Sequence, residues 1–133
     1  SLENILKAVR GFCTGRVIAV FGCGGDRDPF KRPVMGKIAA ELSDLAIVTS
    51  DNPRTEDPYK ILRQILAGMQ DTETPYEVIE SRVSAIGRAM ELARKNDVIV
   101  LCGKGHETYQ EIGHEKHHLD EREVVASYLE AKA

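Results

Sequence analysis

Three short segments of the chain combine glycine with charged side chains and could bind a small charged molecule. They are GCGGDRDPFKRP at residues 22–33, TSDNPRTEDP at 49–58 and GKGHE at 103–107. The planar guanidinium groups of Arg27 and Arg54 match a carboxylate with paired hydrogen bonds, and the Asn52 amide can add another. Glu107, with carbonyls of a glycine turn, suits an ammonium group. A carboxylate and an ammonium side by side form the head of an amino acid, so the pattern predicts an amino-acid site.

Each of these side chains also has an ordinary structural explanation. Asn-Pro starts turns, because the residue before a proline is pushed out of helical geometry, and Asp51 and Asn52 could cap such a turn. Arg27 and Arg54 could form exposed ion pairs with nearby acids, which contribute little stability. The binding interpretation is favoured because the fold is expected to bring the three segments to one place.

Four apolar, β-branched runs predict the strands that carry these segments, at residues 16–21, 45–49, 76–79 and 97–102. Between them apolar residues recur at helical spacing: Val34, Ile38 and Leu42; Ile61, Leu62, Ile65, Leu66 and Met69; Val83, Ile86, Met90 and Ala93. At the start of the chain Leu2, Ile5, Leu6, Val9 and Phe12 form another such face. Pro33 and Pro58 suit first turns, and Asp57 and Ser81 suit N-caps. Strands that alternate with helices indicate a parallel sheet, and ligands bind at the carboxyl edge of such a sheet.

The pattern changes after Cys102. Residues 109–112 and 116–119 can pair across Gly113 as a β-hairpin, and Val124, Val125, Tyr128 and Leu129 follow at helical spacing. The predicted fold class is therefore α/β: a Rossmann-like, mostly parallel sheet flanked by helices, with a C-terminal β-hairpin and a closing helix. A chain of 133 residues is long enough for its own core, and we assign residues 1–133 to a single domain.

Composition excludes several classes of protein. The chain has 18 basic and 21 acidic residues, so nothing suggests nucleic acid as a partner. It has neither an apolar run near the ~20 residues of a membrane helix nor a charged-then-apolar leader, which predicts a protein without a membrane partner. Its three cysteines, Cys13, Cys23 and Cys102, are odd in number and form no C-x-x-C pair, as expected in a reducing cytoplasm.

Three known motifs are matched only in part. The glycines of GCGG do not complete the dinucleotide fingerprint G-x-G-x-x-G, whose third glycine is replaced by Arg27, and a tight strand-to-helix turn explains them. Gly103 and Lys104 are not followed by the Ser or Thr of a Walker loop. HEKHH at 114–118 matches the zinc motif H-E-x-x-H, but that motif needs a helix, and Gly113 with the alternating TYQEI before it indicates a hairpin. We therefore predict no metal site.

Three segments also resemble a known family. VFGCGGDRDPFKRPVMG, TSDNPRTEDP and VLCGKGHETYQ are similar, in this order, to the C-terminal domain of the Mur ligases, in the MurE-type branch that adds meso-diaminopimelate to UDP-N-acetylmuramoyl-L-alanyl-D-glutamate. The resemblance covers nearly the whole chain, and DNPR is its most specific part. It implies an ATP-dependent amide ligase of peptidoglycan synthesis in the bacterial cytoplasm. In that reaction ATP phosphorylates the glutamate side-chain carboxyl, and the free amine attacks the acyl phosphate through a tetrahedral intermediate.

The resemblance assigns roles residue by residue. Asp51, Asn52, Pro53 and Arg54 resemble the diaminopimelate recognition motif. Within it, Asn52 and Arg54 would hold the distal carboxylate, with help from Arg27. Gly103 and Glu107 would hold the distal ammonium. L-Lysine has no second carboxylate, so an unpaired Arg54 would disfavour it.

The family's ATP loop, magnesium ligands, carbamylated lysine and nucleotide-sugar site belong to two other domains. The resemblance therefore implies that residues 1–133 are a fragment of a three-domain enzyme, without a catalytic residue or cofactor of their own and inactive alone. ATP, Mg²⁺ and the UDP-MurNAc-dipeptide would bind mainly through the other domains. The start at Ser1, on the N-cap of an amphipathic helix, fits this interpretation.

Other interpretations stay open. A ligase domain that adds L-lysine, or one of the folylpolyglutamate type, could share this fold, although neither should need DNPR. A freestanding amino-acid-binding module of the same architecture fits the same site residues. A zinc hydrolase built on HEKHH belongs to a different class and would contain one equivalent of zinc.

Overall fold

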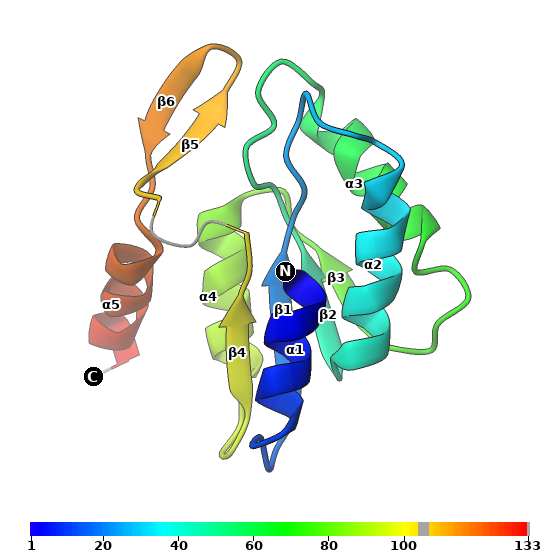
Figure 1. The fold of residues 1–133 in the computed structure, drawn as a ribbon. Coiled ribbons are helices and arrows are strands. Elements are labelled where there is room, and N and C mark those ends of the chain that lie inside the picture. Colours follow the sequence, from blue (N-terminus) through cyan, green and yellow to red (C-terminus); the bar gives the residue numbers. More distant parts are fainter. Residues whose placement is uncertain (104–106, 133) are drawn as a thin grey trace.

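A parallel four-stranded sheet forms the centre of the fold (Figure 1). The computed structural model describes residues 1–103 and 107–132. The strands are β1 (Val17–Phe21), β2 (Leu45–Val48), β3 (Tyr76–Val78) and β4 (Val98–Leu101), in the order β3-β2-β1-β4. The four predicted strands are confirmed, each slightly shorter than its apolar run. Because β2 and β4 flank β1 on opposite sides, the carboxyl ends of β1 and β4 form the switch point at which such sheets bind ligands.

Helices cover both faces of the sheet, which confirms the predicted α/β class (Figure 1). On one face lie α1 (Leu2–Arg10), α2 (Lys31–Leu42) and α3 (Pro58–Ala67); on the other lies α4 (Arg82–Leu92), and α5 (Glu121–Lys132) packs on α4. The predicted helix starts are confirmed: Asp57 accepts a hydrogen bond from Tyr59 N, and Ser81 accepts one from Ser84 N. In the described part of the chain, none of these helices has the length and apolar composition needed to cross a membrane.

The two central strands are buried on both faces, which explains their unbroken apolar sequences. Every residue of β1 and β2 is buried. Val17, Ala19 and Phe21 belong to the core under α1, α2 and α3, whereas Ile18 and Val20 belong to the core under α4. Burial of a Val, Ile or Phe side chain contributes about 1.5–3 kcal/mol relative to exposure. This two-sided core holds the strand ends, and therefore the loops that follow them, in fixed positions.

The predicted inner faces of the helices are partly wrong. Five of the residues assigned to them are exposed: Ile5, Phe12, Val34, Val83 and Leu129. The buried residues of α2 are Arg32, Gly36, Ala39 and Ala40 instead. Gly36 explains this choice, because a Cβ there would overlap the carbonyl oxygen of Ile65 on α3. Close packing between helices therefore selects the face with the smallest residues, which a search for large apolar residues misses.

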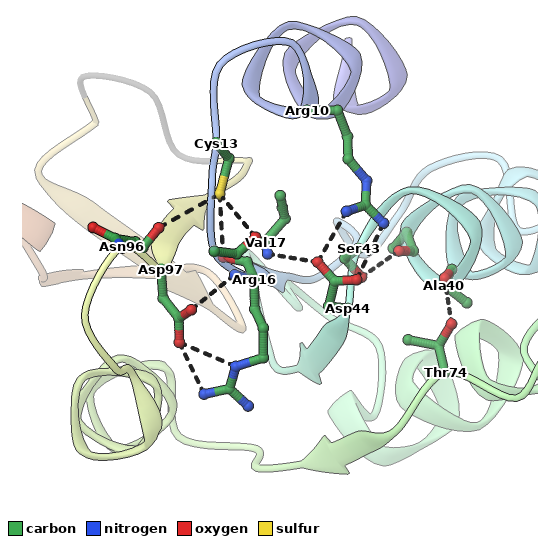
Figure 2. A network of polar contacts seen from close by, with 12 residues as sticks. Arg10, Cys13, Arg16, Val17, Ala40, Ser43, Asp44, Thr74, Asn96 and Asp97 are labelled. Atoms are coloured by element: carbon green, nitrogen blue, oxygen red, sulfur yellow. Dashed lines mark hydrogen bonds and ion pairs between the residues drawn. The ribbon is translucent and has the colours of Figure 1, made fainter.

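A polar network fixes the amino ends of β1, β2 and β4 (Figure 2). Because these strands are parallel, the network lies at the opposite edge of the sheet from the loops that follow them. Asp44, just before β2, accepts hydrogen bonds from Val17 N at 2.8 Å and from Arg10 Nη1 at 2.9 Å. Asp97, just before β4, accepts from Arg16 N at 2.7 Å and from Arg16 Nε at 3.0 Å. Backbone hydrogen bonds, that from Arg16 first, lower the pKa of Asp97 to about 2. Both carboxylates bind the start of β1, so they help to set the alignment of its two neighbours.

A separate two-stranded hairpin follows the sheet. Its strands are β5 (Tyr109–Ile112) and β6 (Glu115–His118), so the second strand begins one residue earlier than the predicted range 116–119. The reason is a two-residue turn: Gly113, at φ 62°, supplies the positive backbone angle that such turns need, and Ile112 pairs directly with Glu115. HEKHH thus lies in a turn and a strand, as predicted, and not on a helix.

Candidate functional site

Two loops at the carboxyl edge of the sheet pack against each other along their backbones. The β1 loop, residues 22–28, follows β1, and the β2 loop, residues 49–57, follows β2 and contains DNPR. Gly25 N donates a hydrogen bond to Asn52 O at 2.7 Å. A Cβ on Gly25 would overlap the carbonyl oxygen of Pro53. Glycine is therefore needed here so that the two backbones can approach, and not only to form a tight turn.

Gly25→Ala is expected to destabilise the chain. The added methyl would meet backbone atoms of Pro53, which cannot rotate away, so the two loops would have to separate. We expect the free energy of unfolding, measured by urea denaturation, to fall by about 1–3 kcal/mol, as is typical of overpacking. Gly11→Ala is the matched control, because Gly11 has helical backbone angles and a Cβ there would come no nearer than 3.3 Å to the Ala8 carbonyl oxygen, a tight contact that a shift of a few tenths of an ångström relieves. Equal stability of the two variants would contradict this account of the loop contact.

Side chains strengthen the contact between the two loops. Asp26 Oδ1 accepts a hydrogen bond from Thr55 Oγ1 at 2.7 Å, and Asp26 N donates to Glu56 Oε1 at 2.7 Å. Asp26 has a φ of 54°, in the left-handed region that a residue other than glycine enters at a cost of about 1–3 kcal/mol. The surrounding contacts must offset this cost, so the β1 loop is held in one shape by the β2 loop.

Arg32, near the start of α2, is the buried cation of this contact. Its guanidinium donates to Glu56 Oε1 at 2.7 Å and Oε2 at 3.0 Å, to Gln64 Oε1 at 2.6 Å and to Gly24 O at 3.0 Å. The hydrogen bond from Arg32 is the main cause that lowers the pKa of Glu56 to about 2. The sequence does not tell what Arg32 contacts; the structure shows that it joins α2, α3 and both loops.

The Arg32–Glu56 pair is expected to make part of the stability depend on pH. The pKa of Glu56 is about 2 in the folded chain against an ordinary value of 4.5, so the stability that it contributes is present above about pH 4.5 and is lost as the pH falls toward 2. On unfolding in acid, the Glu56→Gln variant should take up about one proton fewer than the original chain. Its Tm, measured between about pH 2 and pH 4.5, should therefore change less with pH than the Tm of the original chain. Glu115→Gln, on the exposed strand β6, controls for the loss of one charge. An unchanged slope in Glu56→Gln would contradict this role of the pair.

Arg54 is held in an unusual conformation by the hairpin. Its φ is 53°, in the same costly left-handed region. Arg54 N donates to Glu111 O at 3.0 Å, and Arg54 O accepts from Gly113 N at 2.6 Å, which makes an isolated parallel bridge with β5. The guanidinium donates from Nε to Glu111 Oε2 at 2.8 Å and from Nη1 to Gly25 O at 2.9 Å. Backbone and side chain are fixed together, and strain maintained in this way is typical of functional sites.

Asn52 is buried, and the same strand sets its orientation. The residue is 3% exposed, and its Oδ1 accepts a hydrogen bond from Glu111 N at 2.9 Å. This hydrogen bond identifies Oδ1 as the acceptor that faces β5, and Nδ2 as the donor end of the amide. The hairpin therefore fixes the orientation of the Asn52 side chain.

A cavity of about 450 Å³ opens at the switch point, in the size range of small-molecule sites. Three predicted site residues line it, Arg27, Asp51 and Gly103, together with Asp28 and Lys31. Gly103 has a φ of 111°, and a Cβ on it would lie 3.4 Å from Asp51 Oδ2. The segments after β1, β2 and β4 therefore meet around this cavity, as the sequence predicts.

The other predicted residues lie beside this cavity and not in its lining. Arg54 lines a neighbouring hollow of about 210 Å³. The two arginines nevertheless approach each other: a Cβ on Gly24, which lines the larger cavity, would lie 2.9 Å from Arg54 Nη1 and 3.6 Å from Arg27 Cγ. Pro53 is buried, and Glu107 is half-buried and lines neither space. Residues 104–106 of the GKGHE segment lie outside the described residues.

Two cysteines near the cavity are buried thiols. Burial raises the pKa of Cys23 to about 12 and that of Cys102 to about 11. A thiol with so high a pKa stays protonated at neutral pH and is a poor nucleophile and metal ligand. Both therefore act as small apolar residues of the core.

A second buried arginine ties the ends of two strands together. Arg82, the first residue of α4, donates to Ser50 O at 3.2 Å, to Cys102 O at 2.7 Å and to Glu121 Oε2 at 2.9 Å, and its side chain has no exposed surface. Ser50 directly precedes DNPR, and Cys102 directly precedes the GKGHE segment. Arg82 therefore sets the spacing of the two loops that carry most of the predicted ligands, and Glu121 anchors α5 at the same point.

The sequence does not predict three of these features: the contacts of Glu111, the Arg32–Glu56 pair and the role of Arg82. Each involves a charged residue in a predicted helix, strand or loop, where exposure is the usual expectation. A signal exists for Arg82, because it lies one helical turn before Ile86 on the inward face of its helix. Nothing in the sequence marks Glu111, whose partners lie in a loop far away along the chain.

The fold and the site together define an α/β domain with a charged small-molecule site at the switch point of a parallel sheet. A family model described as "Mur ligase, glutamate ligase domain" matches residues 1–105. The match covers more than half of the chain, so the protein belongs to the family of Mur ligase C-terminal domains.

Individual relatives agree with this assignment. The UDP-N-acetylmuramoyl-L-alanyl-D-glutamate–2,6-diaminopimelate ligase of Trichormus variabilis is 64% identical over 129 residues, which cover 97% of this chain and 26% of the relative. The corresponding ligase of Clostridioides difficile is 53% identical, over 97% of this chain and 27% of the relative. A solved structure of a ligase with the same name superposes with a TM-score of 0.94 at 40% identity, over 98% of this chain and 27% of that one. The predicted resemblance is confirmed, and the chain spans about a quarter of the length of these relatives.

Proposed function

We propose that this chain is the amino-acid-binding domain of a cytoplasmic, ATP-dependent bacterial ligase that adds meso-diaminopimelate to UDP-N-acetylmuramoyl-L-alanyl-D-glutamate in peptidoglycan precursor synthesis. The observation that carries the proposal is that the side chains of two arginines, Arg27 and Arg54, come together beside Gly24, next to an Asn52 amide that the same hairpin holds in place. The names of the relatives, which are 2,6-diaminopimelate ligases, support it. The 133 residues would form one of three domains of the complete enzyme.

The site would hold the distal end of the amino acid. We assign the distal carboxylate to Arg27, Asn52 and Arg54, and the distal ammonium to Asp51, Gly103 and Glu107, with Pro53 shaping the loop between them. Anchoring this end leaves the other amino group free as the nucleophile. The contribution of this domain is therefore to orient the reacting amine, which can replace much of the entropy cost of a bimolecular step.

The activating chemistry belongs to the rest of the enzyme in this proposal. Among the described residues, no three His, Cys, Asp or Glu side chains gather closely enough to hold a metal ion. We place ATP, Mg²⁺ and the UDP-MurNAc-dipeptide mainly in the other two domains, where ATP would convert the glutamate side-chain carboxyl to an acyl phosphate. The amine held by this domain would then attack that carbon.

The 133-residue chain alone is expected to be inactive. The measurement is phosphate release from ATP in the presence of Mg²⁺, meso-diaminopimelate and the acceptor nucleotide, with the complete ligase as the positive control. Release by the isolated chain above the rate without protein would contradict the proposed division of labour.

Amide NMR titration of the chain tests the substrate assignment directly. We expect meso-diaminopimelate to shift resonances of the β1 loop, the β2 loop and the segment after β4, because all three border the cavity. L-Lysine, which lacks the second carboxylate, should leave these resonances unchanged. Equal shifts with both ligands would contradict selectivity at Arg54, and shifts confined to other surfaces would contradict the site.

A further inference from the structure

Glu111, on β5, contacts both β2-loop residues proposed to hold the substrate carboxylate. Glu111 N donates to Asn52 Oδ1 at 2.9 Å, and Glu111 O accepts from Arg54 N at 3.0 Å. The carboxylate of Glu111 accepts from Arg54 Nε at 2.8 Å. One residue of the hairpin thus fixes the backbone and side chain of Arg54 and the amide of Asn52. The hairpin, although it is separate from the main sheet, lines with Arg54 the hollow of about 210 Å³ beside the larger cavity.

The pairing of Glu111 with Arg54 decides which part of the guanidinium can meet a ligand. The two side chains are 26% and 20% exposed, so the pair is partly shielded from water. Glu111 occupies Nε, and Gly25 O accepts one hydrogen bond from Nη1. Within the described residues Nη2 donates to no acceptor. The N–H groups of the Arg54 guanidinium that remain for a ligand are therefore those on Nη2 and the second one on Nη1, at the end of the side chain. A carboxylate at that end can accept two parallel hydrogen bonds.

We infer that Glu111 is a positioning residue that orients the Arg54 guanidinium so that its Nη1–Nη2 end meets the distal carboxylate of a diamino dicarboxylic acid. The inference rests on the proposed function of this site. Without Glu111 the long arginine side chain would regain rotamer freedom, which binding of the substrate would then have to remove. The cost would appear in the affinity for the amino acid and not in the rate of the bound complex.

Glu111 also places a negative charge near the proposed position of the substrate carboxylate, and this repulsion opposes binding. Three substitutions separate the repulsion from the orientation of Arg54. Glu111→Gln keeps an oxygen that can accept from Nε and removes the charge. Glu111→Asp keeps the charge on a side chain that is one methylene shorter and does not reach Nε from the same backbone. Glu111→Ala removes both. If orientation dominates, the glutamine variant resembles the original enzyme and the other two do not.

The test is steady-state kinetics of the complete ligase, with meso-diaminopimelate varied and the other substrates saturating. We expect Glu111→Ala and Glu111→Asp to raise KM roughly 5- to 50-fold, in the middle of the range of coupling between contacting residues, while kcat changes less than about twofold. Glu111→Gln should keep KM within about threefold of the original value, as expected if the hydrogen bond is retained. Glu115→Gln, which removes an exposed carboxylate from β6 of the same hairpin, is the matched control and should leave KM unchanged. If Glu111→Ala does not fold, the KM of Glu111→Asp, which loses the hydrogen bond to Nε, is compared with the KM of Glu111→Gln, which keeps it.

A double-mutant cycle with Arg54→Ala shows whether Glu111 acts through Arg54. Once Arg54 is absent, Glu111→Ala should raise KM no further. An equal increase in both backgrounds, or an unchanged KM in Glu111→Ala while Arg54→Ala raises it, would overturn the inference and leave the proposed function standing. An unchanged KM in Arg54→Ala would overturn the proposed site itself.

Discussion

Arg54→Ala in the complete ligase is expected to raise the KM for meso-diaminopimelate roughly 10- to 150-fold, the range for removing a hydrogen-bonded charged partner. The guanidinium is held at Nε and Nη1, so its loss would remove a donor pair whose direction is already fixed before the substrate arrives. At saturating substrate kcat should change less, because the reacting amine is at the other end of the molecule. The measurement is initial rate against substrate concentration.

Two comparisons make this prediction specific. Arg54→Lys keeps the positive charge but not the planar fork, so it should recover only part of the lost affinity. The weak binding of L-lysine, measured as inhibition, should not weaken further in Arg54→Ala, since lysine has no second carboxylate. An unchanged KM for meso-diaminopimelate, or an equal loss of affinity for both amino acids, would contradict the role of Arg54.

Arg82→Ala is expected to lower the free energy of unfolding of the chain by about 3–5 kcal/mol, as is typical when one partner of a buried ion pair is removed. The side chain has no exposed surface, and its loss would leave the Glu121 carboxylate and the carbonyls of Ser50 and Cys102 without this donor. Urea denaturation measures the loss. Arg88→Ala is the matched control, because Arg88 lies on the same helix in half-exposed pairs and its removal should cost less than about 1 kcal/mol.

The size of the Arg82 effect also depends on its two carbonyl partners. Glu121→Gln leaves Arg82 bonded to Ser50 O and Cys102 O, so it should destabilise the chain less than Arg82→Ala. If Arg82→Ala and Arg88→Ala cost the same, then Arg82 does not hold the strand ends as the structure indicates.

Local patterns predict the frame of this fold well. The strands follow from β-branched runs, and the starts of α3 and α4 follow from Asp57 and Ser81, whose side chains accept the expected hydrogen bonds. Gly113 places the hairpin turn and excludes a helical HEKHH. Each of these features depends on residues that are close together in the chain, so a short stretch of sequence is enough to predict it.

Features that depend on distant residues are not predicted. Gly36 and Ile65 lie on different helices, and their contact decides which side of α2 is buried. The pairing of Arg54 with Glu111 joins two segments that only the folded hairpin brings together. For the site, the sequence identifies the loops that border the cavity, but it does not show that Arg27 lines the cavity whereas Arg54 lines a neighbouring hollow.

Because the backbone of Arg54 is left-handed, some replacements at this position are favoured over others by the conformation alone. Glycine and asparagine adopt that backbone more easily than arginine does, so either replacement would relieve strain while it removes the guanidinium that we propose binds the second carboxylate. A lineage released from the need to choose among amino acids would lose this arginine without losing the fold. Selection for substrate choice, and not for folding, would therefore maintain arginine at residue 54.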